Sequence, residues 1–220
     1  QNLLALQSAR RTMADRAATL EHLVAARTAE LRRSRLEIVE RLGRASAMRD
    51  DETGRHVMRI SRIAALLARR IGWTPQRCEL ILVAAPMHDI GKIGIPDAIL
   101  LKPGPLSPAE REVMRTHTTI GGELLGDSDD PLLVMAREIA LFHHEHWDGS
   151  GYPSGLAGEA IPESARIVAI TDVFDALLSE RPYKTPWTVA RALALLHEHA
   201  GRQFDPRLVA EFEAMLPQVL

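Results

Sequence analysis

HDIGKIGIPD, the stretch from His88 to Asp97, places an imidazole beside a carboxylate at the end of an apolar run. Neutral imidazole and carboxylate oxygens are ligands that suit transition metals such as iron, manganese or zinc. The glycines allow the backbone to approach a ligand closely, and Lys92 offers a cation for an anionic substrate. The stretch therefore raises the hypothesis of a metal-dependent hydrolase. Alone it is weak evidence, because most His-Asp pairs lie on the surface or at a helix end.

The composition is that of a globular protein with a substantial core. The chain has 220 residues, of which 46% are hydrophobic, and a formal net charge of -2. This balance gives no indication of DNA binding through bulk electrostatics, although a local basic pocket stays open. Cys78 is the single cysteine, and its apolar helical surroundings indicate a core residue in a reducing compartment. Apolar runs fall far short of the roughly 20 residues of a membrane span, so we expect a soluble, cytoplasmic protein.

Residues 1–47 have the composition of a long exposed helix, with no proline, one glycine and many Arg, Glu, Ala and Leu. An imperfect heptad predicts a parallel coiled coil that makes a homodimer; the alternative is a solvated helix packed on its own domain. The chain begins in mid-pattern without Met, so we expect an upstream receiver or sensor domain. The repeat runs through Leu3, Leu6, Arg10, Met13, Ala17, Leu20, Val24, Arg27, Leu31, Ser34, Ile38 and Arg41.

Residues 48–220 are predicted to form an all-α domain of shorter amphipathic helices separated by Gly and Pro. Alternating β-branched segments bounded by turns hardly occur. Three expected helix starts have a capping side chain directly before a proline, at Thr74, Ser107 and Asp205. The expected helices span residues 53–71, 76–89, 107–125, 131–146, 162–180, 186–200 and 206–216.

Further residues of metal-ligand type recur at helix faces and ends along this domain. Glu52 and His56 are four residues apart at a helix start, so both side chains can point towards a common ion. Asp172 lies in an apolar segment, where an ionised carboxylate is costly unless it is paired or coordinated. A mixed set of this size exceeds what one tetrahedral zinc takes and suits two or three octahedral-type ions. The other members are His88, Asp89, His117, His143 and His144.

Several longer motifs surround these residues. They are Asp51-Glu52-Thr53-Gly54-Arg55-His56, His88 through Asp97, Lys102-Pro103-Gly104, His143-His144-Glu145, Trp147 through Pro153, Asp172 through Leu177, Arg181 through Lys184, and Phe204-Asp205-Pro206. In this order they resemble the HD-GYP domain, a branch of the HD phosphohydrolase superfamily. The resemblance covers residues from about Asp50 to about Phe212. The resemblance is highly specific, because so many motifs occur in the order that the family has.

The resemblance implies an α-helical phosphodiesterase that hydrolyses the bacterial second messenger cyclic di-GMP at a bimetallic or trimetallic centre. By matching position, it implies that Glu52 is the additional acid of members with a third metal. Iron or manganese is favoured, and nickel or zinc stays open. The implied metal ligands are Glu52, His56, His88, Asp89, His117, His143, His144 and Asp172.

The resemblance also implies which residues act on the substrate. Asp89 and Lys92 are the expected catalytic residues, with Lys92 contacting the scissile phosphate. Gly151, Tyr152 and Pro153 match the signature loop of the family, which is further implicated in binding diguanylate cyclase partners. The expected substrate contacts are Lys92, Asp175, Arg181, Lys184 and the loop residues Gly151, Tyr152 and Pro153.

A mechanism follows from these residue types. Two ions roughly 3.5–4 Å apart would activate a bridging water for in-line attack on phosphorus, while Lys92 and Arg181 neutralise the growing charge. A linear dinucleotide (pGpG) is the expected first product, and a third metal could position it for a second cut to GMP.

Two alternatives stay open. One is hydrolysis of another cyclic dinucleotide, such as a mixed GMP-AMP ring; the other is a sensor module that docks a diguanylate cyclase without useful turnover.

Overall fold

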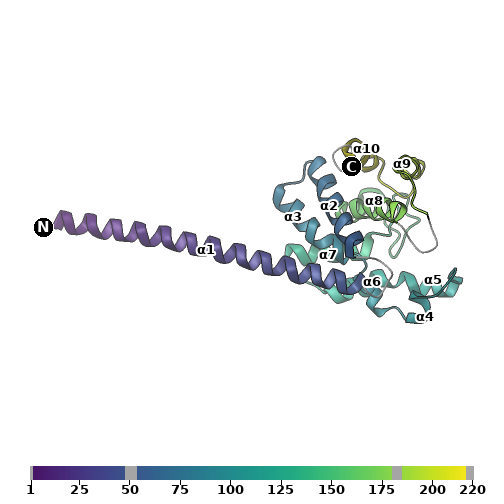
Figure 1. The fold of residues 1–220 in the computed structure, drawn as a ribbon, viewed down its shortest axis with the longest axis horizontal. Coiled ribbons are helices and arrows are strands. Elements are labelled where there is room, and N and C mark those ends of the chain that lie inside the picture. The colour runs from purple at the N-terminus through teal and green to yellow at the C-terminus, as the bar shows by residue number, and fades with distance from the viewer. Residues whose placement is uncertain (1, 48–53, 180–184, 217–220) are drawn as a thin grey trace. The chain divides into compact units, whose positions relative to one another are not determined.

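The computed structural model describes residues 2–47, 54–179 and 185–216. The chain divides into two compact units, Gln1–Ile38 and Val39–Leu220. Within the described ranges there is no β-strand, so the all-α prediction is confirmed (Figure 1). The helices are α1 (Asn2–Ala47), α2 (Gly54–Arg70), α3 (Pro75–Ala84), α4 (Asp97–Leu100), α5 (Pro108–Arg115), α6 (His117–Leu125), α7 (Pro131–Phe142), α8 (Glu163–Leu178), α9 (Val189–Glu198) and α10 (Pro206–Met215), with 3-10 turns η1 (Ala85–Met87), η2 (Ile90–Gly94) and η3 (Gly158–Ala160).

The predicted helix starts are confirmed where a capping side chain precedes a proline. The Thr74 side chain accepts a hydrogen bond from the Arg77 N–H. Ser107 and Glu110 form a reciprocal capping box at the start of α5. Asp205 accepts from the first N–H groups of α10. Such caps satisfy N–H groups that have no partner inside the helix.

Several of the expected helices are shorter than predicted or divided. The helix expected over 131–146 ends at Phe142, so His143 and His144 follow it, and the helix expected over 186–200 spans only Val189–Glu198. The helix expected to reach residue 89 ends at Ala84, because Pro86 has no N–H for the next helical bond, and a 3-10 turn follows. The helix expected over 107–125 is divided at Thr116, whose hydroxyl donates to the Val113 carbonyl. The end at Ala84 places His88 and Asp89 just after a helix, and the division at Thr116 makes His117 the first residue of α6.

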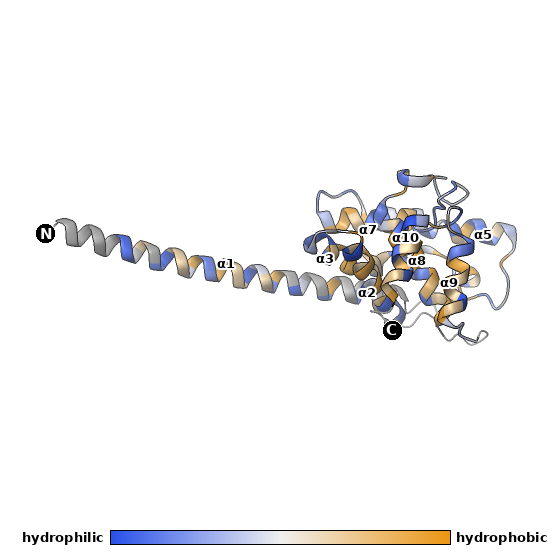
Figure 2. Cartoon of the chain, turned by 90° about the horizontal axis from the view of Figure 1, so that it is seen from above, coloured by the Kyte–Doolittle hydropathy of each residue, from blue (hydrophilic) through white to orange (hydrophobic). Residues whose placement is uncertain are grey.

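The core of the second unit lies among α2, α3, α7, α8 and α10. Leu67 of α2, Ile81 of α3, Ile139 of α7 and Phe174 of α8 are at most 2% exposed. Burying each such side chain stabilises the fold by about 1.5–3 kcal/mol. Figure 2 shows the hydrophobic residues gathered along these helices. This packing fixes the helix ends from which the site described below is built.

α1 is a single helix of 46 residues, and several of the apolar side chains described along it are exposed to solvent. Met13, Leu20, Val24, Leu31 and Ile38, all members of the expected heptad, are between 57% and 73% exposed. In the coloured part of α1 in Figure 2, hydrophobic and hydrophilic residues are interspersed. In the described part of the chain, no helix combines the length and apolarity needed to cross a membrane.

Candidate metal centre

Seven of the predicted ligands come together in the second unit from five segments. His56 comes from α2. His88 and Asp89 lie between the 3-10 turns η1 and η2, and His117 is the first residue of α6. The residues that follow α7 are His143 and His144, and α8 contributes Asp172. The four most buried members, which are at most 3% exposed, are His56, His88, His117 and His143.

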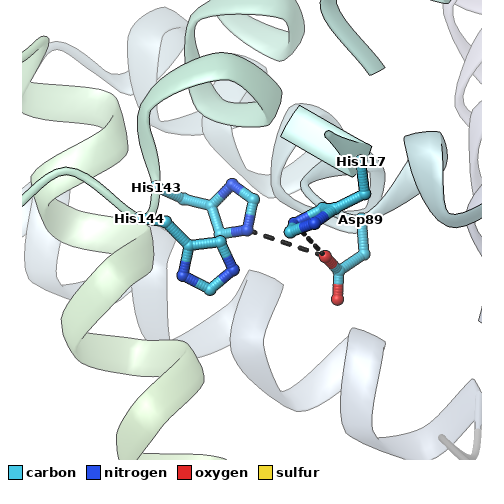
Figure 3. Close-up of side chains that lie close together, drawn as sticks. All are labelled: Asp89, His117, His143 and His144. Atoms are coloured by element: carbon cyan, nitrogen blue, oxygen red, sulfur yellow. Dashed lines mark ion pairs between the residues drawn. The ribbon is translucent and has the colours of Figure 1, made fainter. Parts of the chain in front are cut away.

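Asp89 lies at the centre of one group of imidazoles. Its Oδ1 is 3.2 Å from His117 Nε2 and 3.6 Å from His143 Nε2. Figure 3 shows both rings pointing towards this carboxylate, with His144 beside them. One potential ligand atom from each of the four residues lies within 4.8 Å of the others. The spacing is small enough for one ion to reach all four side chains.

Asp172 forms a second focus beside the first. Its Oδ1 is 3.6 Å from His56 Nε2 and 4.0 Å from His88 Nε2. His88 Nε2 also lies 3.3 Å from Asp89 Oδ2, so this imidazole faces both carboxylates. The two carboxylates therefore belong to one continuous cluster of potential metal ligands.

The tautomers indicate which atoms can bind a cation. The Nδ1 atoms of His88, His117 and His143 lie 2.7–2.9 Å from the carbonyls of Ala85, Met114 and Ile139. A carbonyl only accepts, so each Nδ1 carries the proton and each neutral ring presents a lone pair at Nε2. Those lone pairs face carboxylate oxygens, an arrangement that is repulsive unless a cation lies between them. The donor set therefore fits a divalent metal site.

The charges of the site agree with this assignment. Burial lowers the pKa of His143, and burial together with His143 and His117 holds the pKa of His144 well below its usual value, so both rings favour the neutral form that binds metal. Burial raises the pKa of Asp89, but the Lys92 ammonium lowers it, and the net pKa is well below the ordinary value. Lys92 Nζ lies 2.7 Å from Asp89 Oδ2. The carboxylate is thus held ionised.

The signature loop packs directly against a candidate ligand. The Tyr152 ring stacks on His144 with centroids 4.8 Å apart, and its N–H donates to the His144 carbonyl. A Cβ at Gly151 would lie 2.2 Å from the His146 nitrogen, so only glycine fits there. The buried Glu145 carboxylate accepts from two N–H groups of the loop, those of Ser154 and Leu156. Pro153 follows Tyr152 and is exposed.

A second glycine brings two site segments into contact. A Cβ at Gly91 would lie 1.8 Å from the His117 carbonyl oxygen. Because no larger residue fits, η2 and the first turn of α6 approach at backbone distance. This contact sets Asp89 next to His117.

Asp175, expected among the substrate contacts, contacts the Nδ1 side of the His56 ring, whereas Asp172 lies on the Nε2 side. Its Oδ2 accepts from His56 Nδ1, and Arg59 binds both carboxylate oxygens. Sequence reasoning missed Arg59 and Glu145. The sequence did contain a signal for Arg59. Arg59 lies three residues after His56, and Asp175 lies three residues after Asp172, so each residue shares a helix face with a predicted ligand.

Three predicted site residues lie outside the described residues. They are Glu52, Arg181 and Lys184. Their roles stay predictions.

Comparison with known proteins places this helical fold and its buried His-Asp cluster in one family. A family profile described as "HD domain" matches residues 17–208. The chain therefore belongs to the HD-domain family, and the HD-GYP type expected from the motifs is confirmed.

The relatives include named phosphodiesterases. The chain is 49% identical over 208 residues to the cyclic di-GMP phosphodiesterase response regulator RpfG of Xanthomonas campestris, covering 94% of this chain and 55% of that protein. It is 46% identical over 180 residues to the 3'3'-cGAMP-specific phosphodiesterase 2 of Vibrio cholerae, covering 82% and 34%. The crystal structure of a cyclic GMP-AMP-specific phosphodiesterase of Vibrio cholerae superimposes with a TM-score of 0.63 at 21% identity, covering 83% and 48%. The chain thus spans about half or less of the length of these relatives.

Proposed function

We propose that this chain is the hydrolytic portion of a signalling protein and cleaves the phosphodiester bonds of cyclic di-GMP with bound divalent metal ions. The observation that carries the proposal is the convergence of four imidazole Nε2 atoms on the carboxylates of Asp89 and Asp172. The activity in the name of the RpfG relative supports the choice of substrate.

The same residues would hold the metal. Asp89, His117, His143 and His144 would hold one ion, and His56, His88 and Asp172, together with Asp89, would hold a second. Such ions, when bound, supply Lewis acidity and lower the pKa of water to near neutrality. Imidazole and carboxylate ligands suit iron or manganese, with nickel or zinc as alternatives. Glu52 is proposed as a ligand of a third ion.

The chain's own side chains would orient the substrate. The Lys92 ammonium lies at the edge of the cluster, 2.7 Å from Asp89, where it can neutralise charge on the phosphoryl oxygens. Tyr152 stacks on His144, which is one of the candidate ligands. Gly151, Pro153, Arg181 and Lys184 remain proposed contacts. For Asp175 we propose a positioning role, because its carboxylate is engaged by His56 and Arg59.

A mixed GMP-AMP ring is the second candidate substrate, favoured by the name of the Vibrio cholerae relative. We expect manganese-loaded protein, given equal amounts of both rings, to consume cyclic di-GMP faster and release pGpG first, as followed by chromatography. Faster consumption of the mixed ring would refute the assigned substrate. In the same assay, GMP formation at the parent rate by a Glu52→Ala variant would refute the role proposed for a third ion.

We also propose that residues 1–47 dimerise the protein as a parallel coiled coil, and that a receiver or sensor domain lies upstream of them in the full chain. Several heptad positions of α1 are apolar and exposed, and the RpfG relative is a response regulator. Sedimentation of the chain with and without residues 1–47 tests this: we expect a dimer and a monomer, respectively, and a monomer in both cases contradicts it. A diguanylate cyclase partner at the signature loop and a cytoplasmic location stay predictions.

A further inference from the structure

His56 is oriented by two side chains, Asp175 and Arg59. Its Nδ1 donates to Asp175 Oδ2, and the Asp175 side chain is only 4% exposed. Arg59 donates to the same carboxylate with both arms of its fork, from Nε to Oδ1 at 2.6 Å and from Nη2 to Oδ2 at 2.8 Å. Ser179 Oγ accepts from Arg59 and lies 3.2 Å from Asp175 Oδ2. A connected chain thus runs from Arg59 through Asp175 to the imidazole.

This arrangement differs from that of the other histidines. The Nδ1 atoms of His88, His117 and His143 donate to main-chain carbonyls, which a side-chain substitution does not remove. His56 donates to an ionised carboxylate, which fixes the same tautomer and makes Nε2 a stronger electron donor than a neutral acceptor would. The orientation of His56 therefore depends on two side chains that can be changed individually.

The helix geometry explains why both side chains are needed. His56 and Arg59 lie one turn apart on α2, and Asp172 and Asp175 lie one turn apart on α8, so the two pairs face each other. A buried carboxylate is costly without a cationic partner, and the guanidinium fork supplies that charge while it prevents the carboxylate from rotating. With the carboxylate fixed, Nε2 of His56 faces Asp172 at 3.6 Å.

We infer that Arg59 and Asp175 form a positioning pair that holds the His56 imidazole ready for a metal ion and thereby sets the affinity of the subsite made with Asp172. The inference rests on the proposed metal centre. Neither side chain touches substrate in this role. Both act through His56, so their loss weakens one subsite and leaves the subsite at His117, His143 and His144 intact.

Titration of the chelator-treated full chain with Mn²⁺, followed by calorimetry, tests the pair. We expect Asp175→Asn and Arg59→Gln to weaken one binding event by about 10–100-fold, the usual effect of changing a group that orients a metal ligand. The other event should keep its parent affinity. Arg59→Lys keeps the charge and the apolar stem but loses the fork, so it should fold and show an intermediate loss.

Arg70→Gln is the matched control, because Arg70 lies on the same helix and pairs with Glu211 at 2.7 Å. It should bind Mn²⁺ as the parent does. Parent-like affinity for both ions in Arg59→Lys and Asp175→Asn, or an equal loss at both subsites, overturns the positioning role. If the parent chain itself binds no Mn²⁺, the proposed metal centre is wrong and the inference falls with it.

Discussion

Asp89→Asn is expected to lower the rate of cyclic di-GMP hydrolysis by more than about 100-fold, since even changes behind a metal ligand cost 10–100-fold. The substitution preserves the shape of the side chain but removes the charge that His88, His117 and His143 all face. It also removes the partner of Lys92. The measurement is turnover under metal saturation, with circular dichroism as a check that the variant is folded.

Asp127→Asn is the control for this experiment, because Asp127 is an acid of the same type with a side chain 96% exposed. It should keep the parent rate. Equal and negligible turnover in the parent and in Asp89→Asn would instead favour a sensor module that binds the dinucleotide without cleaving it.

Metal removal is expected to lower the melting temperature by about 5–10 °C relative to protein with Mn²⁺ at roughly 100 times its dissociation constant. Binding at that excess contributes about 2.7 kcal/mol, and 1 kcal/mol moves the melting temperature of a domain of this size by about 2–4 °C. The physical reason is that buried imidazole lone pairs and carboxylates face one another in the fold. Differential scanning calorimetry with and without chelator measures the shift.

The Asp89→Asn variant provides the internal comparison for the thermal shift. Its melting temperature should respond much less to Mn²⁺ than that of the parent. A parent protein that melts at the same temperature with and without chelator would show that the cluster does not bind metal under these conditions.

Helix starts with a capping side chain could be predicted from the sequence, whereas the division of the helix expected over 107–125 could not. Thr74, Ser107 and Asp205 are local signals, since a capping side chain and the N–H that it satisfies are close in sequence. The division at Thr116 depends on where α6 must begin for His117 to face Asp89. Such a break is set by tertiary packing and leaves little trace in propensity.

The site could be predicted as a set of residue types but not as a geometry. Asp172 stood out because a carboxylate in an apolar segment needs a partner. The sequence could not show that Asp175 faces α2, because the partner of a helical side chain is decided by which helix packs against it. Arg59 was missed because its partner Asp175 is 116 residues away in the chain, so only the repeated three-residue spacing pointed to it. Glu145 was missed because its partners are main-chain N–H groups of a loop, which leave no side-chain pattern in the sequence.

Anomalous X-ray diffraction from crystals of manganese-loaded protein tests the central claim most directly. We predict two anomalous peaks, each within roughly 2.0–2.3 Å of imidazole nitrogens and carboxylate oxygens. One should lie among Asp89, His117, His143 and His144, and the other beside His56, His88 and Asp172. Peaks found only at exposed acids such as Asp127, with none at Asp89, would contradict the account.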